Sequence, residues 1–249
     1  MVPTQSFLKA SLQAGRELLR PLTQPDAAPA SNVSAEASRQ PLVMVPIRSI
    51  GPSERDRVAT HLLALQPQDR YLRFGYAATD EHVRRYVNGL DFERDEIFGI
   101  YNRRLELIAM AHLAFSVDPR CASCAEFGVS VLAHARGRGY GARLFDRAVM
   151  HARNQGVTMF FIHALTENTT MLKIARKAGA TVERDGSESE AYLTLPAATL
   201  DTRMTELVEH QFAEVNYTLK AQAKAFREFL AGVQEVRQGV REARHKAGG

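Results

Sequence analysis

The stretch that decides the fold is Glu126-Phe-Gly-Val-Ser-Val-Leu-Ala-His-Ala-Arg136-Gly-Arg-Gly139-Tyr-Gly141-Ala-Arg-Leu144. An apolar strand runs into a glycine-rich turn, and the turn opens an amphipathic helix. Glycines let backbone N–H groups turn toward one point without hindrance from Cβ atoms. The start of the helix adds unpaired N–H groups and the positive end of its dipole. Together with the charges of Arg136, Arg138 and Arg143, these groups predict a nest for a pyrophosphate.

The glycine spacing indicates which nucleotide this turn binds. Gly137-x-Gly139-x-Gly141 alternates, and so differs from the G-x-G-x-x-G of dinucleotide binders. A G-x-x-x-x-G-K-[ST] phosphate loop is also absent from the sequence. By contrast, Arg136-x-x-Gly139-x-Gly141 matches the R/Q-x-x-G-x-G/A signature, and the stretch therefore resembles the coenzyme A site of GNAT acetyltransferases. The alternative interpretation is an ordinary tight turn between a strand and a helix.

A second stretch, residues 167–180, resembles the GNAT motif that follows the next strand. Asn168, Met171, Lys177 and Gly179 match that motif, whereas Ala180 replaces its usual Phe. An isolated Asn before a helix is equally typical of a plain N-cap. The position of Asn168, one strand beyond the glycine turn, favours a place in the cofactor site.

The resemblance covers about residues 43–195, and within the superfamily it is strongest to the bacterial Pat-type protein-lysine acetyltransferases. Residues 69–74 resemble their S-R-Y-L-R-F helix, and residues 125–127 resemble the strand that enters their cofactor site. The resemblance implies acetyl-CoA as cosubstrate and a primary amine as acceptor, either a protein lysine or a small molecule. It also implies direct attack within a ternary complex. The implied cofactor-binding residues are Val129, Val131, Arg136, Gly137, Arg138, Gly139, Tyr140, Gly141 and Asn168.

Acetylation of an amine requires a base, because a lysine with a pKa of about 10.4 is charged at neutral pH. The Pat-type pattern implies that Glu126 is this base, acting directly or through a water. The alternative for Glu126 is an ordinary exposed glutamate on a strand. Many GNAT enzymes use a Tyr as general acid where this chain has Ala175, which leaves Tyr192 or solvent as candidates. A rival interpretation of the whole chain is a GNAT module that binds coenzyme A without catalysis and acts in regulation or assembly.

The pattern of apolar residues predicts an α/β (α+β mixed) fold with a mixed, mostly antiparallel sheet and helices on both faces, and the resemblance implies that this is the GNAT acyltransferase fold. Pro46 favours an edge position for the first strand. Ser53 and Thr79 are expected to cap helices. The expected strands cover residues 42–47, 96–102, 105–116, 125–132, 157–165, 180–184 and 190–195, and the expected helices cover 54–65, 68–75, 80–89, 139–154 and 168–178.

Composition narrows the class of protein. Apolar residues make up 45% and charged residues 24% of the chain, which is typical of a soluble globular protein. A net charge of +4 does not indicate nucleic acid as a partner. No apolar run approaches the roughly 18 residues of a membrane span, so we expect a cytoplasmic protein with no membrane association. Cys121 and Cys124 are expected to be a loop pair in a reducing compartment, and the histidines indicate no metal site.

The chain divides by composition into a flexible extension over residues 1–41, a folded domain over 42–197 and a helical segment over 198–249, and the resemblance implies that the middle part is a GNAT acetyltransferase domain. Apolar residues of the last segment recur at alternating steps of four and three, which is the heptad pattern of a coiled coil. We therefore expect a homodimer or a foreign helix partner, and the alternative is that the helix folds back on its own domain. The seam consists of Val208, Phe212, Val215, Leu219, Gln222, Phe226, Phe229, Val233, Val236, Val240 and Ala243.

Overall fold

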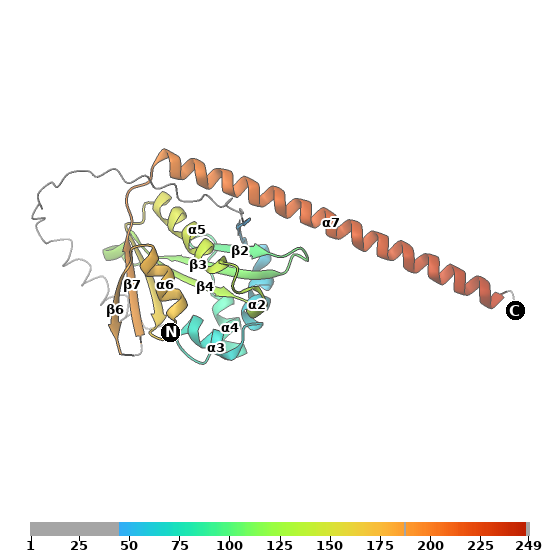
Figure 1. Cartoon of the computed structure of the whole chain (residues 1–249), viewed down its shortest axis with the longest axis horizontal. Helices are drawn as coiled ribbons and strands as arrows, with labels where there is room; N and C mark the ends of the chain where they lie inside the picture. Colours follow the sequence, from blue (N-terminus) through green and yellow to red (C-terminus); the bar gives the residue numbers. More distant parts are fainter. Residues whose placement is uncertain (1–44, 187, 248–249) are drawn as a thin grey trace, which may run out of the picture. The chain divides into compact units, whose positions relative to one another are not determined.

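The computed structural model describes residues 45–186 and 188–247 (Figure 1). Residues 45–116 and 123–249 belong to one compact unit, to which the description below applies. The predicted N-terminal extension lies outside the described residues. In chain order the elements of this unit are β1 Arg48–Ser49, η1 Pro52–Glu54, α2 Arg55–Leu63, α3 Pro67–Phe74, α4 Asp80–Asn88, β2 Glu96–Tyr101, β3 Leu107–Phe115, β4 Cys124–Val131, η3 Ala133–Ala135, α5 Tyr140–Asn154, β5 Met159–Leu165, α6 Thr169–Lys177, β6 Thr181–Asp185, β7 Glu188–Thr194 and α7 Leu200–Ala247.

The strands form one seven-stranded sheet in the order β1-β2-β3-β4-β5-β7-β6. Only β4 and β5 run parallel, and every other neighbouring pair is antiparallel. This confirms the predicted mixed, mostly antiparallel sheet. The parallel pair is joined through α5, because parallel neighbours need a crossover connection rather than a tight turn. The predicted strands 96–102 and 105–116 correspond to β2 and β3, and a tight turn joins them, in which Leu105 N donates to Asn102 O at 3.2 Å.

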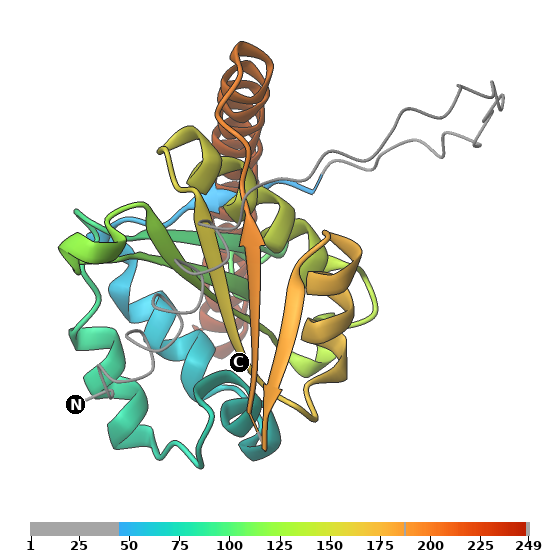
Figure 2. The same ribbon diagram turned by 90° about the vertical axis from the view of Figure 1, so that its left-hand side faces the viewer.

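Helices cover both faces of the sheet, as predicted, because successive strand residues point to opposite faces. On one face, Ala111, Phe127 and Phe160 belong to a core that also contains the apolar sides of α5 and α6. On the other face, Ile97 and Met110 belong to a second core with α2 and α4. Figure 2 shows these helices with the sheet edge-on between them. One face of β4 is therefore buried in the first core, and the other face contacts α3.

One predicted helix cap is confirmed and one is wrong. Thr79 Oγ1 accepts from His82 N at 3.3 Å, while Thr79 N donates to His82 Nδ1 at 3.4 Å, which makes a reciprocal cap for α4. Ser53 caps no helix, because Pro52 starts a 3₁₀ turn that includes it. The N-cap of α2 is Glu54, which makes no side-chain cap bond.

Two further expectations are corrected at the ends of β1 and β4. Residues 45–47, the described part of the first predicted strand, are not a strand, and β1 follows them as an edge strand. Pro46 explains the shift because it has no N–H to donate to a neighbouring strand. Cys121 and Cys124 are both disulfide-bonded rather than free thiols.

The C-terminal segment is one continuous helix, α7, as its periodicity predicts (Figure 1). Its first half packs on the unit through Ala213, which is 1% exposed, and through Glu206, which bonds to His151 and Asn154 of α5. Lys220 Nζ donates to Tyr101 O at 2.9 Å, near the end of β2. Among the described residues, no helix is both long enough and apolar enough to cross a membrane.

Candidate active site

The central feature of the site is the point where β4 and β5 stop pairing. The two parallel strands are paired only from Cys124↔Met159 to Glu126↔Phe161. Beyond that point β4 remains paired with β3 as far as Val131, and β5 remains paired with β7 as far as Leu165. The sheet is therefore split along one line, which begins at Glu126 and runs toward the carboxyl ends of both strands.

The backbone of β4 faces this split with polar groups that are not paired to another strand. Ser116 N donates to Cys124 O at 2.9 Å, and Leu132 N donates to Ile108 O at 3.0 Å. Even-numbered β4 residues thus direct their backbone groups toward β3, because the groups of successive residues alternate in direction along a strand. Val129 and Val131 direct theirs toward β5, beyond the last β4–β5 pair. In the described sheet no strand pairs with that side of either residue. An extended chain that carries amides fits such an edge.

The glycine-rich turn lies at the end of this split. Gly137 and Gly139 both have φ of 74°, a conformation that strains a residue with a side chain. Gly139 is the N-cap of α5 and provides no side-chain cap, and the helix pattern begins with Arg143 N donating to Gly139 O at 3.1 Å. The first N–H groups of α5, starting with Tyr140, therefore have no intrahelical acceptor. This arrangement suits an anion.

Gly141, in the first turn of α5, is a glycine that the packing of the protein does not require. Its φ is not positive, and an added Cβ would meet only Ile174 Cδ1, at an ordinary 3.6 Å. The chain itself therefore has room for a side chain at this position. Glycine inside a helix is less stable than alanine by roughly 0.5–1 kcal/mol. Packing within the protein therefore does not require a glycine at this position.

Two of the predicted cofactor residues are already engaged in other contacts. Arg136, about half exposed, forms an ion pair with Asp69 of α3, and its Nε donates to Val131 O at 3.4 Å. Asn168 caps α6, its Oδ1 accepting from Met171 N at 3.2 Å. The alternative interpretation of Asn168 as a helix cap is thus confirmed. Because β4 and β5 are parallel, the starts of α5 and α6 lie at the same edge of the sheet, and Asn168 and the turn flank the split. Arg138 is exposed at the turn.

Glu126, the predicted base, occupies the position where the split begins. It is partly buried on β4, between its register partners Ala114 on β3 and Phe161 on β5. Strand alternation places it on the same face as Gly128, opposite to the face that carries Phe127. The alternative interpretation is an ordinary exposed glutamate on a strand, and Glu126 is instead partly buried. Its location combines access to the split with a face that α3 and α4 cover only in part.

The general acid stays unassigned. Ala175, at the position where many GNAT enzymes have a Tyr, is fully buried in the core. Tyr192 lies on β7 opposite Phe161, in the same row as Glu126 but two strands away. Its hydroxyl donates to Glu183 Oε1 at 3.0 Å. This contact and the separation from β4 do not single out Tyr192 as a proton donor to a group in the split.

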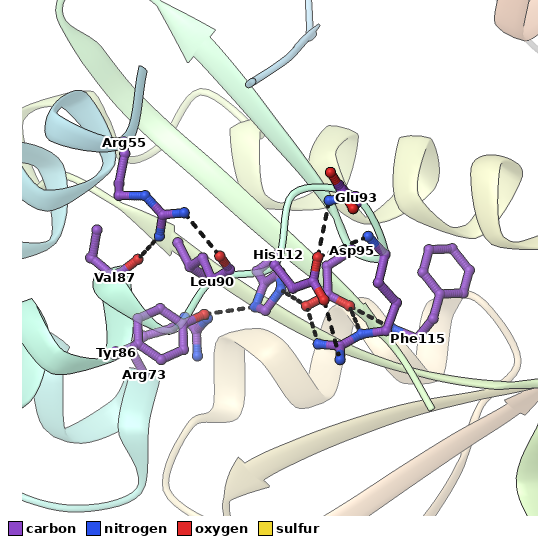
Figure 3. A network of polar contacts seen from close by, with 11 residues as sticks. Arg55, Arg73, Tyr86, Val87, Leu90, Glu93, Asp95, His112 and Phe115 are labelled. Carbon is purple, nitrogen blue, oxygen red and sulfur yellow. Dashed lines mark hydrogen bonds and ion pairs between the residues drawn. The ribbon is translucent and has the colours of Figure 1, made fainter. Parts of the chain in front are cut away.

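A polar network that the motifs did not reveal contains Arg73, Tyr86, His112 and Asp95 (Figure 3), and the charge of Glu126 acts on Tyr86. Arg73 Nη2 donates to Tyr86 Oη at 2.9 Å, and Tyr86 Oη lies 2.7 Å from His112 Nδ1. His112 Nε2 lies 3.1 Å from Asp95 Oδ2. Burial raises the pKa of Tyr86, and Arg73 opposes this rise. These residues come from α3, α4, β3 and the loop before β2, so only the register of β3 and β4 could have indicated their association.

Comparison with known proteins agrees with this geometry. Residues 62–180 match the acetyltransferase (GNAT) family. The fold is similar to the GNAT domain of Streptomyces lividans PAT, with 22% identity, a TM-score of 0.51, and coverage of 60% of this chain and 89% of that one. It is also similar to the GNAT-family acetyltransferase of Streptococcus pneumoniae, with 12% identity, a TM-score of 0.50, and coverage of 60% of this chain and 98% of that one. A search of curated proteins found no match. The described residues contain no group of three or more side chains arranged to hold a metal.

Proposed function

The chain contains a domain of the acetyltransferase (GNAT) family over residues 62–180, and from this premise we propose that it transfers an acetyl group from acetyl-CoA to a primary amine. The observation that carries the proposal is the split after Glu126, where no strand pairs with the β5-facing side of Val129 and Val131, and which leads to the glycine-rich turn. This is a continuous row of sites for a ligand that joins amides to a pyrophosphate. Coenzyme A has that chemistry.

Each part of the ligand is assigned to residues that fit it. The amides of the pantetheine arm pair with Val129 and Val131, as an added strand would. The pyrophosphate lies against the first N–H groups of α5, next to Gly141, with Arg138 adding positive charge. Since the phosphates occupy the turn, the thioester points back along β4 toward Glu126. Acetyl-CoA supplies the activated acetyl group, and the protein supplies its orientation.

The residues around Glu126 then carry out the transfer. Glu126 accepts a proton from the ammonium group, directly or through a water, and the neutral amine nitrogen then attacks the thioester carbonyl carbon. The second proton that the nitrogen loses passes to solvent water. The electron pair of the carbonyl moves to oxygen and returns as the C–S bond breaks. The thiolate is an adequate leaving group because free thiols have a pKa of about 8.5.

The charge of the neighbouring face favours a cationic acceptor. In the strand register, Glu190 of β7 lies opposite His163 of β5 and opposite Glu183 of β6. Both glutamates are therefore on the same face of the sheet as Glu126. Acidic groups around an approach path raise the local concentration of a cation. A polyamine, another small amine or a protein lysine shares this charge, so the acceptor class is a protonated primary amine.

Mass spectrometry with isotopically labelled acetyl-CoA and a mixture of small amines, peptides and proteins tests the proposal. We expect labelled amides from at least one class, and much less product from the Glu126→Gln variant. Binding of coenzyme A without any amide product would contradict the proposal. That outcome would favour the non-catalytic coenzyme A module, with which the buried Ala175 is also compatible.

A further inference from the structure

Arg73 lies directly on the backbone of β4 beside the proposed base. An added Cβ at Gly128 would lie 2.6 Å from Arg73 Cζ and Nη2 and 2.7 Å from Nη1, so the guanidinium lies flat against the strand at this glycine. Gly128 is two residues beyond Glu126 and therefore on the same face. Any side chain at position 128 would displace the guanidinium. The strand is thus shaped to bring a permanent cation next to the start of the split.

The guanidinium is held by a chain of hydrogen bonds with one direction (Figure 3). The pKa of Asp95 falls to about 2, because hydrogen bonds from His112 and Arg94 outweigh the effect of burial. An ionised carboxylate only accepts, so His112 Nε2–H donates to it, and Nδ1 is free to accept the hydroxyl of Tyr86. The Tyr86 oxygen then accepts from Arg73. If both nitrogens of His112 carried hydrogen, the Tyr86 hydroxyl hydrogen would face only donors.

Asp95, the last acceptor in this series of hydrogen bonds, is held firmly in place. The side chain of Asp95 is 2% exposed. It accepts from Arg94 Nε at 2.8 Å and from Phe115 N at 3.2 Å. A fully bonded polar network of this kind fixes its members in a single geometry. Rotation of Arg73 away from Gly128 would leave Tyr86 without its donor.

We propose that Arg73 stabilises the oxyanion of acetyl transfer, and that Tyr86, His112 and Asp95 are the positioning residues that aim it. The inference rests on the proposed function, which directs the thioester toward residues 126–128. After Glu126 has accepted a proton from the ammonium group, the C–N bond forms, the carbonyl oxygen gains negative charge, and the nitrogen loses its second proton to solvent water. An N–H group of Arg73 donates to that oxygen and keeps its proton throughout. The C–S bond then breaks and the charge leaves with the thiolate. A preorganised donor of this type acts on the transition state more than on the bound substrate.

The first experiment removes one hydroxyl. Tyr86→Phe should lower kcat about tenfold while leaving the Kd of coenzyme A unchanged, because Arg73 loses the acceptor that orients it. Tyr76→Phe is the matched control, since it removes a phenol from the exposed loop just after α3. Equal kcat values for the two variants would overturn the inference. If the wild-type protein makes no amide at all, the proposed function fails as well, so the two failures are distinguishable.

The second experiment separates chemistry from folding. Arg73→Ala should lose more than tenfold in kcat, and millimolar guanidinium should restore part of it, because the vacated space over Gly128 matches the ion. Arg73→Lys should keep part of the activity through its charge. A merely structural role for Arg73 would give a lower melting temperature and no rescue. Absence of rescue in an Arg73→Ala protein with an unchanged melting temperature would also contradict the assignment.

Discussion

Arg136, the first residue of the glycine-rich turn, forms an ion pair with Asp69 on α3. Asp69 is mostly buried, and in the described residues its Oδ2 has no hydrogen-bond partner. The cation expected to meet the pyrophosphate is therefore held by a carboxylate when no ligand is present. If coenzyme A binds as proposed, it competes with Asp69 for Arg136, and the charge of Asp69 also repels the phosphates.

This competition predicts opposite effects for the two partners. Arg136→Ala should weaken coenzyme A binding by roughly 1.5–3 kcal/mol, the range for hydrogen bonds to charged groups. Asp69→Asn should strengthen binding a few-fold, because it frees Arg136. Calorimetry on both single variants and on the double variant gives the coupling free energy between Arg136 and Asp69 in coenzyme A binding. If Asp69→Asn tightens binding equally in the Arg136→Ala background, Arg136 is not the group that it restrains.

Gly141 offers a test of the phosphate nest that does not disturb the fold. Gly141→Ala should leave the melting temperature unchanged or slightly higher, because an added Cβ meets only Ile174 at 3.6 Å. The same substitution should weaken coenzyme A binding at least tenfold by blocking close approach of the pyrophosphate. Gly89→Ala, at the end of α4, is the control. Unaltered affinity in Gly141→Ala would remove the argument for a ligand at this helix start.

Glu126→Gln should lower the turnover rate about a hundredfold at neutral pH with coenzyme A affinity nearly intact. The rise of rate with pH should also flatten, because the variant has lost the group that accepts the proton of the amine. Steady-state rates over a pH series measure both effects, and Glu93→Gln on the exposed loop before β2 serves as the control. Normal turnover by Glu126→Gln would transfer the role of base to a water held by backbone groups.

The structural features behind these predictions differ in how far the sequence alone indicates them. The turn at 136–141 and the order of strands and helices were predicted because glycine spacing and apolar periodicity are local properties. The split after Glu126 depends on where two strands stop pairing, which no local pattern records. Likewise, Arg73 meets Tyr86 and His112 only because β3 and β4 pair in one register. Asn168 shows the converse, since one sequence signal is equally typical of a cap and of a ligand contact.

The docking of α7 should weaken in acid. The pKa of Glu206 falls to about 2, because hydrogen bonds from His151 and Asn154 outweigh burial, and Arg147 adds attraction. Its folded-state pKa lies below the ordinary 4.5, so the stabilisation is complete above that pH and is lost as pH falls toward 2. Hydrogen-exchange protection of residues 200–220, corrected for intrinsic rates, should fall across this window. Glu206→Gln should show weaker protection at neutral pH and less dependence on acid; an unchanged profile would contradict the assignment.

The heptad seam of α7 lies on a different side of the helix from the contacts with the sheet unit. Val215 and Leu219 are each 59% exposed and Phe226 is 61% exposed, whereas Ala213, two residues before Val215, is buried. The helix does lie on its own domain, as the alternative expected, but it uses another face, and the described part of the seam, residues 208–226, stays exposed. A stripe with a 3.5-residue period packs best against another helix with the same period, and a second copy of this chain provides one.

We therefore expect the full-length protein to form a dimer through α7. Leu219→Glu combined with Phe226→Glu should convert it to a monomer in sedimentation experiments at micromolar concentration, because two charges would be buried in the seam. Gln222→Leu should have the opposite effect and tighten association, since a polar residue in the seam reduces stability while fixing register. Acetylation by the monomeric variant should be retained, because both substitutions lie away from the split and from the contacts that Glu206 and Lys220 make with the unit. A wild-type protein that already sediments as a monomer would rule out strong self-association and leave a helix from another protein as the partner of the seam.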